Sequence, residues 1–231
     1  MRYCEKVGGD IAYNFMGSGF AKSTTVGQFF IPFKDGGKRA DGRDLIAEMK
    51  AKSYTYASTQ AELAAVDASK TDRLFGLFTS SHMSYDLDRD PSKEPSLAEM
   101  TTKAMDVLSK NSKGYFLMVE GGRIDHALHG TNAKRALADT IAFDDAIKAA
   151  LDKAKLTDPT LANTLIVVTA DHDHTLAFNG YGKRGNPILD INRDYKTGQP
   201  SKDADGNIIE APKTEDTSRS WFSYMTFGLF D

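Results

Sequence analysis

The chain has 231 residues, of which 40% are hydrophobic and 26% are charged, and its formal net charge is −3. This composition is ordinary for a soluble globular protein, and it leaves no basic field that would recruit nucleic acid as a specific partner. No run approaches the roughly 18 apolar residues of a membrane span, and the polar start MRYCEKVGGD does not fit a signal peptide. With Cys4 as the single cysteine, an internal disulfide and a thiolate metal cluster are excluded.

The first half of the chain predicts short alternating elements. Apolar side chains at helical spacing indicate a helix over 44–52, and tyrosines alternating with polar residues indicate a strand near 54–56. Thr59 and Glu62 have the spacing of a capping box, which predicts the start of a second helix. The compact apolar run 73–79 (RLFGLFT) predicts another strand.

The second half predicts a larger strand, helix, strand unit. Ser96 and Glu99 again have capping-box spacing and begin a clear helix. The runs 115–119 (YFLMV) and 164–169 (TLIVVT) are typical of strands buried on both faces of a parallel sheet, and 132–155 is an amphipathic helix between them. We therefore expect an α/β fold, a mostly parallel sheet with helices on both faces, in a single domain that spans all 231 residues.

Two short matches to ligand-binding loops are weak. Residues 17–24 (GSGFAKST) have Ala21 where a phosphate loop places glycine before the lysine, so a flexible glycine loop is the better interpretation. Residues 203–207 (DADGN) have their glycine out of register for a calcium loop. We expect neither loop to bind its ligand.

Polar side chains concentrate in two other stretches, 119–130 (VEGGRIDHALHG) and 169–175 (TADHDHT), which hold four of the five histidines. Each stretch follows one of the two predicted buried strands. Ligands of open parallel sheets bind beyond the carboxyl ends of the strands, so both stretches are expected to meet in one crevice. Two converging motifs of this kind predict a metal site. His82, in TSSHMS, lacks such support and is interpreted as a loop histidine.

The spacing of these residues indicates which metals they suit. Asp125 and His129 are four residues apart, so one helical turn places them on one face as a chelating pair for zinc. Asp171 and His172 supply a second mixed pair. Glu120 has no adjacent imidazole, and a lone hard oxygen ligand suits magnesium better.

Two further histidines, His126 and His174, are placed to orient the ligands through outer hydrogen bonds. Two metals about 4 Å apart clamp the attacking and leaving oxygens of a phosphoryl transfer. The ligand types alone do not choose phosphate over peptide or sulfate.

The residues around both motifs resemble the alkaline phosphatase family. SLAEMTTKAMDVLSKNSKGYFLMVEGGRIDHALHGTN and TLIVVTADHDHT look like its central metal-binding segments, and the likeness runs from about Gly9 to Gly228. Both motifs are specific to the family, whereas the helices around them are less so. The resemblance implies a periplasmic or extracellular dimer that hydrolyses phosphate monoesters through a phosphoserine, with two zinc ions and one magnesium ion.

The resemblance also assigns a role to each site position. It implies a magnesium ligand, two ligands of a first zinc, and two ligands of a second zinc: Glu120; Asp125 and His129; Asp171 and His172. His174 matches an outer histidine that steadies a ligand carboxylate. His126 matches a position near the magnesium and the phosphate.

Other parts of the family pattern have no match. The serine nucleophile segment is expected upstream of Met1, and the segment with the third ligand of the first zinc is expected beyond Asp231. We therefore expect part of an alkaline phosphatase that is inactive alone and self-associates through unpaired strand edges. The alternatives are a related metal-dependent phosphodiesterase or sulfatase, and a non-catalytic module that binds metal or a partner.

Overall fold

The computed structural model describes residues 43–79, 82–130 and 132–174, together with short pieces between 179 and 227. The match to a phosphate loop at 17–24 lies outside the described residues, as does nearly all of the 203–207 match. The chain divides into two compact units. Unit 1 comprises Met1–Gly122 and Ile141–Val167, and unit 2 comprises Arg123–Thr140 and Val168–Asp231.

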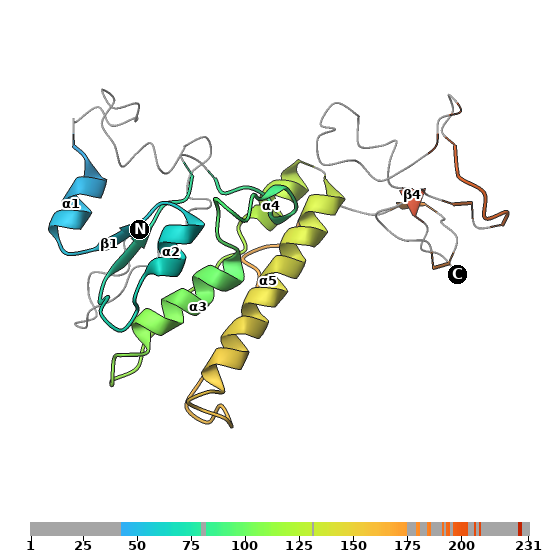
Figure 1. Ribbon diagram of the computed structural model, residues 1–231. Coiled ribbons are helices and arrows are strands. Elements are labelled where there is room, and N and C mark those ends of the chain that lie inside the picture. The colour runs from blue at the N-terminus through green and yellow to red at the C-terminus, as the bar shows by residue number, and fades with distance from the viewer. Residues whose placement is uncertain are drawn as a thin grey trace. The chain divides into compact units, whose positions relative to one another are not determined.

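Unit 1 contains a parallel pair of strands connected through a helix (Figure 1). The helix α1 (Leu45–Ala51) leads into β1 (Thr55–Ala57), which pairs in parallel with β2 (Leu74–Gly76). Between these strands runs α2 (Gln60–Ala65), which contacts β1 and begins at the predicted cap residue Thr59. This strand, helix, strand unit confirms the predicted α/β class and its parallel pairing.

The core of unit 1 lies where this sheet meets α2 and α3 (Leu97–Leu108). Its largest fully buried apolar side chains are Leu74 and Phe75 of β2, each 1% exposed. Burial of one such side chain contributes about 1.5–3 kcal/mol. The core cluster consists of Ala57, Leu63, Leu74, Phe78, Met83, Met100, Val107 and Leu108.

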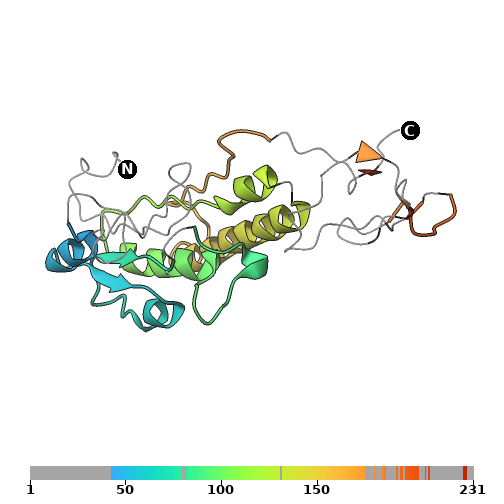
Figure 2. The ribbon, with the colours of Figure 1, turned by 90° about the horizontal axis from the view of Figure 1, so that it is seen from above.

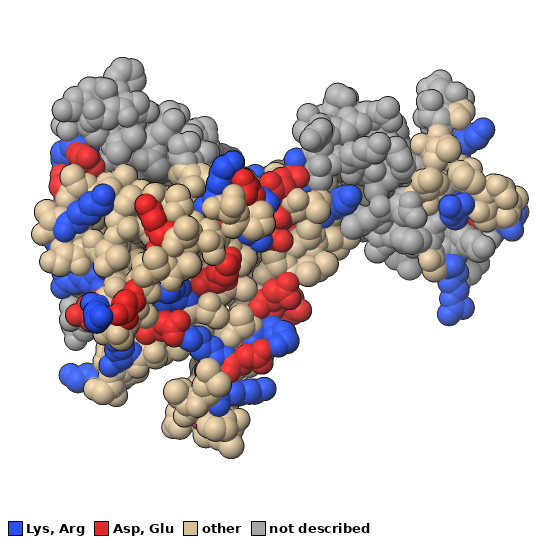
Figure 3. Space-filling model, viewed as in Figure 1, with Lys and Arg blue, Asp and Glu red and all other residues tan. Residues whose placement is uncertain are grey.

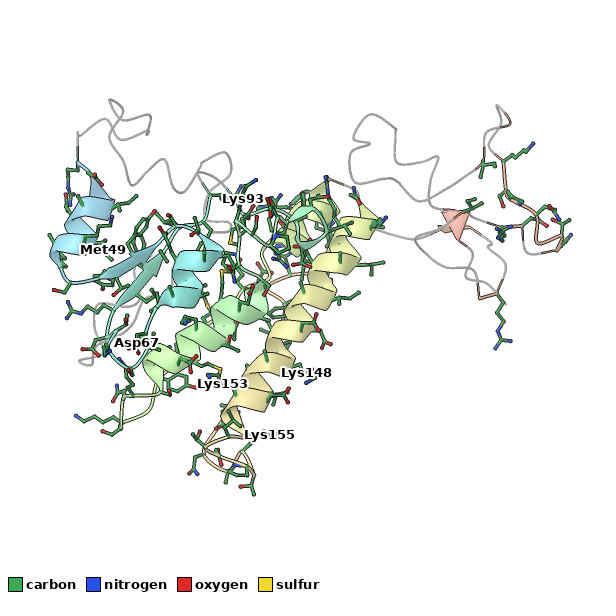
Figure 4. The ribbon with its side chains drawn as sticks, in the orientation of Figure 1. Met49, Asp67, Lys93, Lys148, Lys153 and Lys155 are labelled. Atoms are coloured by element: carbon green, nitrogen blue, oxygen red, sulfur yellow. The ribbon has the colours of Figure 1, made fainter. Side chains whose placement is uncertain are left out.

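The helix α3 starts at the predicted capping box. The Ser96 hydroxyl accepts from the Glu99 backbone N–H, and the Glu99 carboxylate accepts from the Ser96 backbone N–H at 2.7 Å. Further along α3, Asp106 Oδ1 lies 2.6 Å from Lys153 Nζ. Figure 4 labels Lys153. This ion pair joins the end of α5 (Ala133–Ala154) to α3.

The helix α5 is the 22-residue amphipathic helix predicted for 132–155. Its solvent-exposed side carries charged residues, and Lys148 forms an ion pair with Asp152 one helical turn further on. Acidic and basic side chains are interspersed over α2, α3 and α5 on the face that Figure 3 shows. None of the described helices is both long enough and apolar enough to cross a membrane.

The prediction of strands at 115–119 and 164–169 is wrong, because both stretches are coil in the structure (Figure 2). Leu117 packs against the core, but Phe116 is 84% exposed and Leu165 is 88% exposed. An apolar run in a sequence predicts burial, but it does not identify the strand that would pair with it. Among the described residues, neither run is hydrogen-bonded to a neighbouring strand. The larger βαβ unit is therefore not formed.

Unit 2 contains α4 (Arg123–His129), the first two turns of α5 and the segment 168–174. It also contains a short parallel pair, β3 (Asn179–Gly180) with β4 (Thr226–Phe227). The helical turn that the sequence predicted for Asp125 and His129 is confirmed, because both residues lie in α4.

Candidate metal centre

In unit 2, three imidazole rings converge on one carboxylate oxygen. Nε2 of His129 lies 3.4 Å from Asp125 Oδ1, and Nε2 of His172 and of His174 each lie 3.9 Å from the same oxygen. That oxygen is buried and has no hydrogen-bond partner in the described part of the chain. A buried carboxylate oxygen left this way is costly unless something satisfies it, and a cation shared with the imidazoles would do so.

The first segment of the centre is the seven-residue helix α4, which fixes the spacing of Asp125 and His129. Ala127, on the opposite side of the helix, is fully buried and anchors it. The helix closes where the Gly130 N–H donates to the His126 carbonyl at 2.9 Å. Asp125 and His129 therefore stand one turn apart on the open side of a short, anchored helix.

The second segment of the centre is 171–174, which forms neither a helix nor a strand. The His172 ring contacts the Asp173 carbonyl oxygen through Nδ1 at 2.7 Å, so Nδ1 carries the proton and donates it. Nε2 of the neutral ring then carries the lone pair, and this atom lies 3.5 Å from Asp171 Oδ2 and 3.9 Å from Asp125 Oδ1. The Asp173 carbonyl, followed by the Asp171 carboxylate, raises the pKa of His172.

His174 is closer to the centre than its expected outer role requires. Its side chain is 15% exposed, and its ring packs edge-on against His129 with centroids 4.7 Å apart. Asp125, His129 and His174 offer ligand atoms that all lie within 4.8 Å of one another. The signal in the sequence was the two-residue spacing of His172 and His174, since the Nε2 atoms of both rings lie 3.9 Å from Asp125 Oδ1.

The remaining predicted residues are less close. The Asp171 side chain is 89% exposed, and its Oδ2 lies 3.5 Å from His172 Nε2. Glu120 belongs to unit 1, so its assignment to magnesium stays a prediction. His126 faces Arg123, whose Nη1 lies 2.9 Å from His126 Nδ1. Sequence reasoning missed this contact, although the three-residue spacing on a helix is a signal for it.

Comparison with known proteins identifies the family of this chain. The family model described as alkaline phosphatase matches residues 10–205. The chain therefore belongs to the alkaline phosphatase family.

Named relatives agree with that assignment. The chain is 47% identical over 159 residues to a membrane-bound alkaline phosphatase of Bombyx mori, covering 66% of this chain and 28% of that protein. It is 41% identical over 214 residues to the tissue-nonspecific alkaline phosphatase of Gallus gallus, covering 90% of this chain and 37% of the relative. Against the corresponding isozyme of Rattus norvegicus, identity is 37%, with 90% of this chain and 36% of the relative covered.

A solved structure supports the same fold. The alkaline phosphatase of Thermus thermophilus superimposes with a TM-score of 0.51 at 35% sequence identity, over 56% of this chain and 26% of that one. The chain thus spans about a third of the length of the curated relatives described above, which is 28% to 37%.

Proposed function

We propose that this chain carries most of the metal site of a phosphate monoester hydrolase that uses two zinc ions and one magnesium ion. The observation that carries the proposal is the convergence of three imidazoles on Asp125 Oδ1, within 3.9 Å. Membership of the alkaline phosphatase family supports the choice of a phosphate ester as substrate.

The donor set fits zinc. Zinc binds imidazole nitrogen and carboxylate oxygen at about 2.0–2.2 Å in tetrahedral geometry, so two ligand atoms of one ion lie roughly 3.3 Å apart. The His129 Nε2 to Asp125 Oδ1 distance of 3.4 Å matches that spacing without a hydrogen bond between the atoms. Asp125 and His129 would hold the first zinc.

The second zinc would be held by His172 and Asp171, whose ligand atoms lie 3.5 Å apart. The Asp173 carbonyl orients the His172 ring, which is the usual task of an outer hydrogen bond at a metal site. His174, whose Nε2 lies 3.9 Å from Asp125 Oδ1, would steady Asp125, and Glu120 would hold magnesium. Bound zinc polarises phosphoryl oxygens and lowers the pKa of bound water.

The expected experiment is a zinc titration of the purified chain by calorimetry, with zinc content measured after dialysis. Wild type should bind zinc, whereas His129→Ala and His172→Ala should each lower the stoichiometry or the affinity. His82→Ala, a histidine substitution in unit 1, is the matched control and should bind as wild type does. Unchanged zinc binding in both site variants would rule out the centre.

Turnover is a separate question. Nothing in residues 1–231 matches the serine nucleophile segment of the family, so these residues alone should hydrolyse an aryl phosphate negligibly at alkaline pH. Weak hydrolysis by metal-bound hydroxide is compatible with this. Hydrolysis at a normal enzymatic rate by wild type, lost in His129→Ala, would contradict the expected inactivity.

The two alternative functions predict different results in assays of ester hydrolysis. A related phosphodiesterase or sulfatase would keep the metal site and change the preferred ester, which a panel of aryl phosphates, diesters and sulfates distinguishes in the complete protein. A non-catalytic module would bind zinc and hydrolyse none of them. The family resemblance supports a periplasmic or extracellular location as part of this proposal, and cell fractionation with an antibody against this chain tests it.

A further inference from the structure

The ring of His174 lies beside Asp125 without a hydrogen bond to it. Its Nε2 is 3.9 Å from Asp125 Oδ1, which is too long for a hydrogen bond. Its Nδ1 is buried and has no hydrogen-bond partner among the described residues, and the same holds for Asp125 Oδ1. A role limited to steadying Asp125 requires a hydrogen bond between the two side chains, and this arrangement does not contain one.

Asp125, His129 and His174 instead have the spacing of ligands of one ion. Nε2 of His129 lies 3.4 Å and Nε2 of His174 lies 3.9 Å from Asp125 Oδ1, and ligand atoms of the three residues all lie within 4.8 Å of one another. The rings of His129 and His174 pack edge-on, with centroids 4.7 Å apart. Moving Nε2 of His174 from 3.9 Å to the tetrahedral spacing of roughly 3.3 Å is a shift of about 0.6 Å, which is similar to ordinary thermal displacement.

His172 is a poorer candidate for the same ion. Its Nε2 is also 3.9 Å from Asp125 Oδ1, but it lies closer to Asp171 Oδ2, at 3.5 Å. The Asp173 carbonyl holds its ring through Nδ1. His172 therefore stays with Asp171, whereas the carboxylate beside His174 is Asp125.

We infer that His174 is a third direct ligand of the zinc ion at Asp125 and His129. The inference rests on the proposed function for the ion itself, and it replaces the outer role of His174 there. Two imidazoles and one carboxylate are a donor set that catalytic zinc sites use, and they leave a fourth position for water or a substrate oxygen. The third ligand would also tie α4 to the segment 171–174, which belongs to the same unit.

The bonds to the ion can be observed in wild type loaded with ¹¹³Cd²⁺, which takes the place of zinc. Heteronuclear spectra show scalar coupling between cadmium and the ring protons of a histidine only when a ring nitrogen is bonded to the metal. One cadmium signal should couple to ring protons of both His129 and His174, which are assigned from His129→Ala and His174→Ala. His82→Ala, in unit 1, is the control and should leave these couplings unchanged.

His174→Cys gives an independent test, because a thiolate is itself a metal ligand. This variant should recover the zinc affinity that His174→Ala loses, which is about tenfold or more. Loaded with cobalt, it should also show a thiolate-to-cobalt charge-transfer band that wild type lacks, whereas His82→Cys should show none. Circular dichroism establishes that each variant is folded, and the wild-type cadmium spectra decide by themselves if His174→Cys is not.

The outcomes separate this inference from the proposed function. A cadmium signal coupled to His129 but not to His174 would overturn the inference and leave the proposed function standing. A folded, cobalt-loaded His174→Cys without the band would do the same. Wild type that binds neither zinc nor cadmium, or that binds cadmium without coupling to His129, would refute the proposed function and the inference together.

Discussion

Residue type and spacing predicted single residues of the candidate metal centre, but they did not predict how those side chains are oriented. The motifs predicted Asp125, His129 and His172 as ligands, and the structure brings their ligand atoms within 3.9 Å of Asp125 Oδ1. The sequence did not predict which ring nitrogen of each histidine carries a proton and which carries the lone pair. That depends on the hydrogen-bond partner, a carbonyl for His172 and a guanidinium for His126.

The carboxyl group of Asp90, which lies outside the candidate metal centre, gives a testable prediction of how the stability of the chain depends on pH. The hydroxyl of Ser92, followed by Lys93, lowers the pKa of Asp90 from 3.8 to about 2. A carboxylate with a depressed folded pKa adds stability above its unfolded pKa and loses it as the pH falls toward the folded value. Asp90→Asn should therefore lower the melting temperature at neutral pH, and the difference from wild type should shrink between about pH 4 and pH 2.

Asp144→Asn, on the exposed side of α5, controls for the removal of any surface carboxylate. It should leave the melting temperature close to that of wild type at neutral pH. A gap between wild type and Asp90→Asn that stays constant across the acid range would contradict the assignment.

Among the elements, helices were predicted well and strands less well. The predicted helix 132–155 is observed as Ala133–Ala154, and the helix predicted from Ser96 begins at Leu97. Helices make their hydrogen bonds locally, so spacing and caps specify them. The runs 115–119 and 164–169 carry the composition of strands, but a strand requires a neighbouring strand that local sequence does not describe.

The capping box of α3 gives a prediction at this scale. Ser96→Ala removes the hydroxyl that accepts from the Glu99 N–H, and it should cost about 1 kcal/mol of unfolding free energy. Urea unfolding followed by circular dichroism measures it as a lower midpoint with an unchanged slope. Ser109→Ala at the other end of α3, whose hydroxyl makes only a 3.4 Å contact, should change the midpoint much less. Equal losses in both variants would contradict the role of the cap.

For the whole molecule, the family and the α/β class with a parallel sheet were predictable, whereas the strands that pair and the division into two units were not. Composition and motifs specify a class of fold, whereas compact units depend on which distant segments pack together. The single domain that the sequence predicted stays a prediction. Several large apolar side chains are exposed to solvent, and their exposure is the feature of the whole molecule with the largest physical consequence. In unit 1 they include Phe116, Met118, Leu165 and Val167.

Exposed apolar runs with strand composition favour association between chains. Wild type should therefore elute above the monomer mass in size-exclusion chromatography with light scattering. Phe116→Ser combined with Met118→Ser should shift it toward the monomer, because both exposed apolar side chains are removed. The control pair Ile141→Ser and Leu156→Ser, also at exposed positions, should leave the elution unchanged. A wild-type chain that is monomeric at every concentration would contradict this expectation.

The central claim is that Asp125 and His129 share a zinc ion, and the position of that ion tests it most directly. Anomalous scattering at the zinc edge, from crystals of the zinc-loaded chain, locates the ion. We predict a peak about 2.0–2.2 Å from both Asp125 Oδ1 and His129 Nε2. Zinc bound elsewhere with these two atoms unligated, or no zinc peak in the loaded crystals, would contradict the account.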